Sequence, residues 1–323
     1  MMGALVSTII PVFNRSALLV EAVQSVVAQT YRPIEIVIVD DGSTDDTPAT
    51  IRSLIDQHPG IVRSIRIDNG GPGAAREAGR LLAQGEFIQY LDSDDLLLAE
   101  KFQAQVGALN QNPDCDIAYG KTQFTWIGQP PEPGAYRRTG EKHDRLFPSF
   151  LTGRWWCTQT PLYRRSLTDR MGPWTTLWSE EDWEYDARAG SLRARLCFVD
   201  VFVSQQRAHK PELHLSFGST TDPDKLRDRA RAHEWILRHA QAAGITTSQP
   251  EMQHFARALF LLARQCGAAG LANESQRLVE CSREAAGPAR GGALDYKLYR
   301  AGARLLGWKT MGRLSLWLDE RRS

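Results

Sequence analysis

Residues 6–91 alternate between two hydrophobic periodicities, and this alternation leaves the chain few possible folds. Short β-branched runs are each followed by a segment with an apolar residue at every third or fourth position. Strands and helices that alternate in this way build βαβ units. Strands are expected over residues 6–12, 34–39, 61–67, 87–91, 158–163 and 195–203. We therefore expect an α/β fold with a Rossmann-like, mostly parallel sheet flanked by helices.

The second half of the chain has a different composition. A Pro/Gly-rich stretch from Gln129 to Gly140 breaks the regular pattern. After Asp222 the sequence is rich in Ala, Leu and Arg, with helical periodicity. The pattern predicts a catalytic domain over residues 1–218 and a C-terminal helical appendage over residues 219–323.

Overall charge and cysteine content exclude several classes of protein. The 39 Lys and Arg balance 38 Asp and Glu, so the chain lacks the basic character of a dedicated nucleic-acid-binding protein. Its 5 cysteines are scattered without a C-x-x-C pair, which predicts neither a disulfide framework nor a zinc ribbon and favours a cytoplasmic location. No stretch has the ~18–20 apolar residues that cross a bilayer, so any membrane contact is expected to be peripheral.

Two acidic clusters follow expected strands directly. Asp92-Ser93-Asp94-Asp95 follows one strand, and Asp40-Asp41 follows another. Because ligands of open α/β sheets bind beyond the carboxyl ends of strands, both clusters are expected at one rim. Carboxylates crowded on a turn favour a divalent cation such as Mg²⁺ or Mn²⁺, which also bridges to phosphates. The alternatives are a cap for a helix that begins near Leu96 and a simple Asx turn at Asp40.

A glycine-rich segment, Gly70 to Gly73, precedes another expected helix. It does not complete G-x-G-x-x-G and follows the third strand instead of the first, which argues against a Rossmann dehydrogenase. Arg76, in the first turn of this helix, can reach the rim and bind a phosphate or a carboxylate. A solvated surface arginine is the alternative.

Two further segments contain groups that could take part in chemistry. The acidic run Glu180 to Glu184 begins a helix, where the helix dipole alone would favour it, and one of its carboxylates could instead be a general base. Arg207-x-His209 follows a strand and could bind a phosphate or a metal, although isolated histidines are more often ordinary polar partners.

Taken together, these segments resemble glycosyltransferase family 2, nucleotide-sugar transferases with the GT-A fold, over about Val6 to Ser216. The resemblance rests on several motifs in the same order. They are Val6 to Asn14, Gln29-Thr30-Tyr31, Glu35 to Asp45, Asn69 to Arg76, Gly85 to Ile88, Leu91 to Asp95 and Glu181 to Glu184.

The resemblance implies how the donor, a nucleotide sugar, is bound. Pro11 and Phe13 would line the nucleotide pocket, and Asp41 would bind the base, commonly uracil. The full implied set is Pro11, Phe13, Asp41, Arg76, Asp92 and Arg207.

The resemblance also implies metal-binding and catalytic residues. Asp92 and Asp94 match the family's D-x-D pair, with Asp94 the direct ligand of Mg²⁺ or Mn²⁺. His209, in a late R-x-H element with Arg207, would help to hold the diphosphate or the metal. Asp182 corresponds to the catalytic base of the family's E-D motif.

The resemblance implies transfer of a sugar from a UDP-linked donor to a hydroxyl of a saccharide or glycolipid acceptor, with inversion. The resemblance implies polysaccharide or glycolipid biosynthesis in the cell envelope, at the cytoplasmic face of the plasma membrane. Membrane spans and the Q-x-x-R-W signature of processive members are missing, which disfavours a chain-building synthase. One alternative is a noncatalytic protein that binds sugar nucleotides. The other, a pyrophosphorylase, needs a glycine-rich loop where this chain has Pro11 to Asn14.

Aromatic residues and the C-terminal tail suggest two further contacts. Five tryptophans could stack on an acceptor sugar, although at least half are expected in the core: Trp155, Trp156, Trp174, Trp178 and Trp183. The tail from Leu294 to Ser323 is basic and amphipathic, a pattern compatible with an anionic membrane surface. Packing against the catalytic domain is the favoured interpretation of the tail.

Overall fold

The computed structural model describes residues 3–208 and 220–321, which form two compact units. Among these residues, the sheet unit comprises 3–145, 155–176 and 193–208, and the helical unit comprises the rest. The division expected between residues 218 and 219 falls outside the described ranges and stays a prediction.

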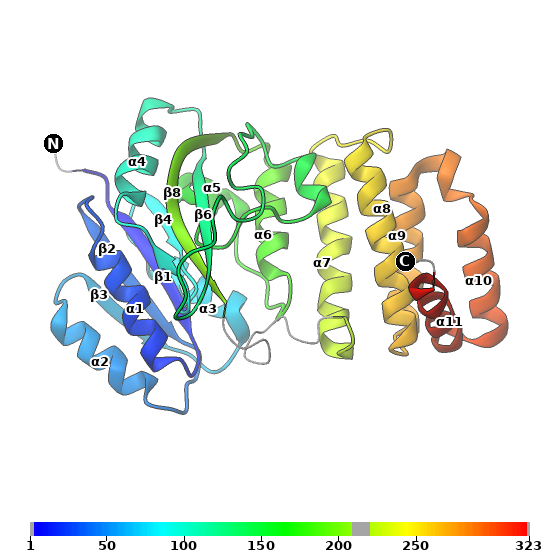
Figure 1. Ribbon diagram of the computed structural model, residues 1–323, viewed down its shortest axis with the longest axis horizontal. Coiled ribbons are helices and arrows are strands. Elements are labelled where there is room, and N and C mark those ends of the chain that lie inside the picture. Colours follow the sequence, from blue (N-terminus) through cyan, green and yellow to red (C-terminus); the bar gives the residue numbers. More distant parts are fainter. Residues whose placement is uncertain (1–2, 209–219, 322–323) are drawn as a thin grey trace. The chain divides into compact units, whose positions relative to one another are not determined.

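The sheet unit is built on eight strands in one sheet (Figure 1). The strands are β1 (Val6–Val12), β2 (Ile34–Asp40), β3 (Val62–Arg66), β4 (Phe87–Tyr90), β5 (Leu96–Leu97), β6 (Ile117–Trp126), β7 (Leu162–Arg164) and β8 (Leu196–Ala208). Their order is β3-β2-β1-β4-β7-β6-β8-β5. The first four strands in this order are mutually parallel, so their carboxyl ends share one rim. This confirms the α/β class with a Rossmann-like sheet.

Helices cover both faces of the sheet. They are α1 (Ser16–Val27), α2 (Thr47–Gln57), α3 (Gly71–Leu82), α4 (Lys101–Gln111) and α5 (Arg165–Met171). Ile36 and Ile38 of β2 share a core with α1, α2 and α4, whereas Val37 and Val39 pack against α3. Alternate side chains of a strand point to opposite faces, so a strand as uniformly apolar as β2 must be covered on both.

Two local expectations differ from the structure. Leu96 does not begin a helix, because Leu96–Leu97 pairs with β8 as a short antiparallel strand and α4 begins at Lys101. The strand expected over residues 158–163 is only Leu162–Arg164. Just before it, the Thr160 carbonyl accepts side-chain hydrogen bonds and therefore does not continue a strand ladder.

The strand order creates a switch point beside β1. The chain runs from β1 to β2 and β3 on one side and then returns to place β4 on the other side. Ligands of open α/β sheets bind at such reversals, outside the carboxyl ends of the two diverging strands. The residues that follow β1 and β4 are therefore the first candidates for a binding site.

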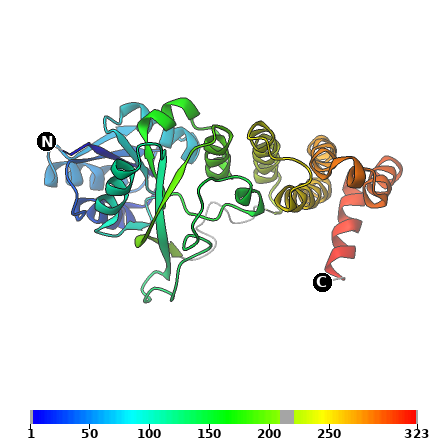
Figure 2. The same cartoon turned by 90° about the horizontal axis from the view of Figure 1, so that it is seen from above.

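The helical unit contains a 3-10 turn and six α-helices. They are η1 (Ser149–Thr152), α6 (Glu181–Ser191), α7 (Pro223–Ala242), α8 (Pro250–Ala268), α9 (Ala272–Gly291), α10 (Leu294–Leu306) and α11 (Trp308–Glu320). Figure 2 shows α7, α8 and α9 packed side by side. Asp222 caps α7 by accepting hydrogen bonds from the backbone N–H groups of Asp224 and Lys225. The helical character expected for the C-terminal region is confirmed. In the part of the chain that the structure describes, every helix is too short or too polar to cross a bilayer.

Lys101, the first residue of α4, is a fully buried lysine. Its Nζ donates a hydrogen bond of 2.9 Å to the Thr160 carbonyl, which also accepts one of 3.0 Å from Gln105 Nε2. Burial lowers the pKa of Lys101 well below its usual value. The charged form is therefore unfavourable in the folded chain.

We predict that Lys101→Met raises the free energy of unfolding by about 1–2 kcal/mol at pH 7. The pKa of Lys101 is lower in the folded chain than in the unfolded chain, so the unfolded wild type binds more protons. The wild type therefore loses stability as the pH falls from about 10. The advantage of the variant should grow from pH 9 to pH 7 in urea unfolding. Lys142→Met, at an exposed lysine, is the control. An equal difference at both pH values would contradict this account of Lys101.

Candidate active site

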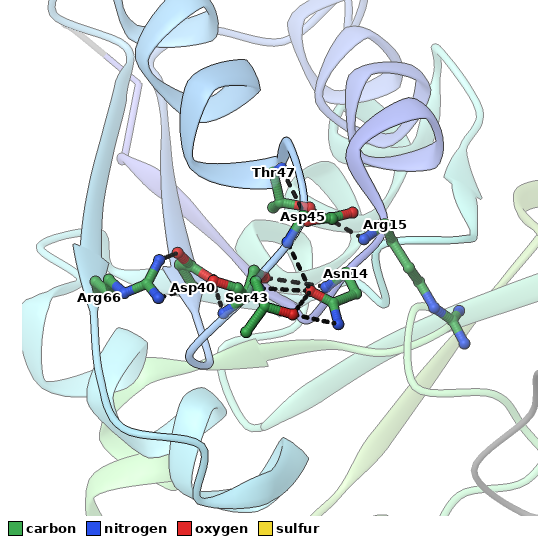
Figure 3. Close-up of polar contacts among 8 residues, drawn as sticks. Asn14, Arg15, Asp40, Ser43, Asp45, Thr47 and Arg66 are labelled. Atoms are coloured by element: carbon green, nitrogen blue, oxygen red, sulfur yellow. Dashed lines mark hydrogen bonds and ion pairs between the residues drawn. The ribbon is translucent and has the colours of Figure 1, made fainter.

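Asn14 joins the loops that follow β1 and β2 (Figure 3). Its φ of 51° lies in the left-handed region, which asparagine tolerates better than most residues. Its Oδ1 accepts from the backbone N–H groups of Thr44 at 2.8 Å and Asp45 at 3.3 Å, and its own N–H donates to Ser43 Oγ. The chain leaving β1 is thereby fixed against the loop after β2.

Asp40 has a structural role in the same loop. Its Oδ1 accepts from the Ser43 N–H at 2.8 Å, and its Oδ2 forms an ion pair of 2.7 Å with Arg66 at the end of β3. Figure 3 shows Arg66, Asp40 and Ser43 in line. The Asx turn considered from the sequence would bond the N–H two residues on, whereas Asp40 accepts from the N–H three residues on.

Asp41 holds the start of α3. Its two oxygens accept from the N–H groups of Gly70 at 2.8 Å and Gly71 at 3.0 Å. Gly71 has a φ of 85°, which favours glycine. Burial raises the pKa of Asp41, and the two backbone hydrogen bonds oppose that shift. The side chain that the resemblance assigns to the base thus also fixes the loop from β3 to α3.

Arg76 links α3 to the residues that follow β4. It is 4% exposed, so it is not the solvated arginine considered as an alternative. Its Nη2 donates to Asp92 Oδ1 at 2.7 Å, and its guanidinium lies 4.9 Å from the centre of the Trp174 ring. The structure therefore brings Arg76 to the acidic turn.

Two more arginines bind the Asp92–Asp95 turn. Arg15, three residues beyond the end of β1 and just before α1, forms an ion pair with Asp94. Arg207, near the end of β8, donates from Nε to the Asp94 carbonyl and from its backbone N–H to Asp95 Oδ1 at 2.8 Å. Its Nη1 also pairs with Glu21 of α1. The turn caps no helix in the way considered from the sequence, since α4 begins only at Lys101.

Asp95 is the buried member of the turn. It is completely buried, and burial raises its pKa well above the usual value. The negative charges of Asp94 and Asp92 raise this pKa further, against the hydrogen bond from Arg207. Crowded carboxylates of this kind are stabilised by added positive charge.

The other donor residues expected from the sequence lie near the same rim or outside the described residues. Pro11 is buried in β1 opposite Val39, and Phe13 is 43% exposed just beyond β1. His209 lies outside the described residues. Sequence reasoning missed Arg15 and Glu21, although the position of Arg15 in the short loop between β1 and α1 was a usable signal.

Asp182, the expected base, lies on α6 of the helical unit. Its Oδ2 accepts from Arg154 Nη1 at 2.7 Å, and its Oδ1 accepts from the Trp183 N–H at 2.7 Å. Arg154 Nε also donates to Asp186 Oδ2 at 2.9 Å, and Asp186 is completely buried. Arg154 therefore fixes the orientation of Asp182, whose catalytic role stays a prediction.

The neighbouring glutamates have partners on α7. Glu180 pairs with Arg229 and His233, each at 2.8 Å, and Glu184 pairs with His239 at 3.0 Å. Burial tends to raise the pKa of Glu180, but His233 and Arg229 outweigh it and the pKa is lowered. These two glutamates serve helix packing, which distinguishes them from the Arg154-bound Asp182.

Most of the tryptophans are core residues, as expected. Trp155, Trp156 and Trp174 are at most 6% exposed, whereas Trp178 is 44% exposed. Among the described residues, no three His, Cys, Asp or Glu side chains are grouped so that they could hold a metal ion. A divalent ion at the Asp92–Asp95 turn would therefore need further oxygen ligands from substrate or water.

The parallel strands, the switch point and the charged groups beside it define an α/β protein with a candidate ligand site at the carboxyl ends of its strands. Residues 7–168 match the model of glycosyl transferase family 2. The chain belongs to glycosyltransferase family 2 and has the GT-A fold expected of it.

Relatives extend this match over different lengths. The chain is 30% identical to the glycosyltransferase GlyG of Streptococcus pneumoniae over 241 residues, which is 73% of this chain and 66% of the relative. It is 38% identical to an uncharacterized glycosyltransferase of Haemophilus influenzae, over 33% of this chain and only 43% of the relative. It is 43% identical to an uncharacterized glycosyltransferase of Rickettsia felis, over 38% of this chain and only 20% of the relative.

Two proteins of solved structure share the fold at low sequence identity. S. aureus TarS 1–349 in complex with UDP-GlcNAc has a TM-score of 0.67 and 19% identity, and the match covers 98% of this chain and 91% of TarS 1–349. The mannosyltransferase PcManGT from Pyrobaculum calidifontis, in complex with GDP-Man and Mn²⁺, has a TM-score of 0.51 and 18% identity over 96% of this chain and 84% of PcManGT.

We predict that Asp41→Ala lowers the free energy of unfolding by about 1–3 kcal/mol, because the partly buried N–H of Gly70 and the buried N–H of Gly71 lose their acceptor. Urea unfolding measures the change. Asp46→Ala, at an exposed carboxylate that caps nothing, should change stability by less than about 0.5 kcal/mol. Equal effects of the two variants would refute the structural role of Asp41.

Proposed function

We propose that this chain transfers a glycosyl group from a nucleotide diphosphate sugar to an acceptor hydroxyl, with inversion at the anomeric carbon. The observation that carries the proposal is the set of arginines around the Asp92–Asp95 turn. Arg15, Arg76 and Arg207 come from three separate segments and meet carboxylates at the switch point of the sheet. Such a mixture of cations and carboxylates suits a diphosphate with a divalent ion.

The donor is proposed to be UDP-linked. The nucleotide would lie over the ends of β1 and β2, near Pro11, Phe13 and Asp41. Each Asp41 oxygen accepts one backbone hydrogen bond and keeps capacity for a second, so the carboxylate can still accept from the base. The nucleotide sugars bound by TarS and PcManGT support a donor of this class.

The chemistry of the turn fits a divalent cation. Mg²⁺ and Mn²⁺ favour carboxylate oxygens, and the Asp92 side chain is 31% exposed. Asp94 and Asp92 would hold the ion, with His209 as a further ligand, and the Mn²⁺ in PcManGT supports this assignment. When bound, the ion supplies positive charge that stabilises the departing diphosphate. Arg15 and Arg207 would place two more cations beside Asp94 for the same purpose.

Asp182 is proposed as the general base. It would accept the proton of the acceptor hydroxyl while that oxygen bonds to the anomeric carbon. The bond from this carbon to the diphosphate oxygen breaks on the opposite face, so the configuration inverts. Arg154, itself bound to buried Asp186, would hold the carboxylate in one orientation during this step.

The proposed setting is polysaccharide or glycolipid assembly for the cell envelope at the cytoplasmic face of the plasma membrane, with residues 1–218 as the catalytic domain. The acceptor is proposed to be a saccharide or a glycolipid. The five cysteines are thiols, four of them buried, which supports a reducing compartment.

We predict that Asp182→Asn lowers kcat by about 10²–10⁴-fold while the donor Kd changes little, because an amide cannot take the proton. Initial rates at saturating donor and calorimetric donor titration separate the two effects. Asp56→Asn, at an exposed helix carboxylate, should retain full activity. Undiminished turnover of Asp182→Asn would remove the base assignment. Donor binding by the wild type without transfer to any acceptor would favour the noncatalytic alternative.

We predict that Asp94→Ala removes the cation-dependent part of donor binding. Thermal shift with UDP- and GDP-linked sugars, in Mn²⁺, in Mg²⁺ and in EDTA, measures it, since a ligand that binds the folded state raises the midpoint. The wild type should respond most to a UDP-sugar with a divalent cation, and Asp56→Ala should behave like the wild type. If the wild-type shift were the same in EDTA, the metal proposal would be wrong.

A further inference from the structure

Helix α10 carries an exposed apolar stripe on the side away from its buried residues. Leu294, Leu298 and Leu305 are 68%, 58% and 84% exposed, and exposed Ala301 lies between the last two. Their spacing of four, three and four residues puts all four on one helical face. The buried residues of α10 are Tyr296, Tyr299 and Ala303. The stripe is therefore not part of the core of the helical unit.

A basic pocket borders this stripe. Its volume is about 230 Å³, and four cationic side chains line it together with Tyr296 and Ala301. The cations are Arg283 of α9 and Lys297, Arg300 and Arg304 of α10. No acidic side chain lines the pocket in the part of the chain that the structure describes. The pocket is thus suited to an anion such as a phosphate.

The stripe and the pocket lie next to each other on the helix. Lys297 and Arg304 each precede a stripe leucine by one residue, which places them about 100° around the helix from that leucine. Long basic side chains beside leucines can extend toward phosphates while the leucines enter an apolar layer.

Helix α11 adds exposed apolar side chains. Leu314 and Trp317 are 40% and 45% exposed, and the Arg321 guanidinium lies 3.9 Å from the centre of the Trp317 ring. The other side of α11 packs closely on α8, where a Cβ at Gly312 would clash with the Ala268 nitrogen. Both terminal helices therefore bury one side and expose apolar and basic groups on another.

We infer that the α10 face binds the surface of an anionic phospholipid bilayer, with the stripe leucines inserted and the pocket cations on lipid phosphates. Exposed leucines alone would suit many partners, but the adjoining cations select a surface that is both apolar and anionic. The inference goes beyond the proposed transfer reaction and does not depend on it, because it concerns binding alone.

The test is co-sedimentation of the full chain with vesicles. The wild type should bind phosphatidylcholine vesicles that contain phosphatidylglycerol, bind pure phosphatidylcholine weakly, and dissociate in high salt. Leu298→Asp and Leu305→Asp should each weaken binding by about tenfold or more. Leu81→Asp, at a leucine 69% exposed on α3, is the matched control and should bind like the wild type.

The pocket is tested separately. Arg300→Gln and Arg304→Gln should each weaken binding to the anionic vesicles by about fivefold, whereas Arg52→Gln, at an exposed arginine of α2, should not. Equal loss in the leucine or arginine controls would overturn the inference. The inference would also be overturned if inorganic phosphate abolished vesicle binding while both leucine variants bound normally. The pocket would then bind only a free anion. Sedimentation velocity tests whether the α10 face instead binds a second copy of the chain. A dimer that Leu298→Asp dissociates, together with no vesicle binding, would overturn the inference.

Discussion

The balance of charge at the Asp92–Asp95 turn is the constraint on which the rest of the sheet unit depends. Three carboxylates follow one strand, and the buried one has its pKa raised by burial and by its neighbours. Arg15, Arg76 and Arg207 offset this repulsion, and they come from the loop after β1, from α3 and from β8. Holding them there requires the fixed loops that Asn14 and Asp41 maintain. The positions of the loops at this rim therefore depend on the ion pairs between these arginines and the carboxylates of the turn.

Features set by local sequence could be predicted. The apolar runs of β1 to β4 gave the strands, and their parallel arrangement placed Asp41 and Asp92 at one rim. Features set by distant pairing could not. Leu96 and Leu97 form a strand only because β8 pairs with them more than a hundred residues later. The contact of Arg15 with Asp94 likewise depends on how the chain leaves β1, which a left-handed Asn14 decides.

The acidic run on α6 shows the same limit in another way. The sequence predicted that this run begins a helix, but it did not predict which partner each carboxylate binds. Glu180 and Glu184 are bound by side chains of α7, some fifty residues further along, while Asp182 is bound by Arg154 from an earlier segment. These partners have no local signature, since an arginine or histidine on a distant helix becomes informative only when packing brings it close. Only the folded structure distinguishes the environment of Asp182 from those of Glu180 and Glu184.

Arg154 connects a partly exposed carboxylate to one that never meets solvent. A substitution at Asp186, in the interior of the helical unit, would therefore change how Arg154 holds Asp182 while every exposed side chain stays the same. The orientation of a surface carboxylate is in this way controlled from a position that solvent does not reach.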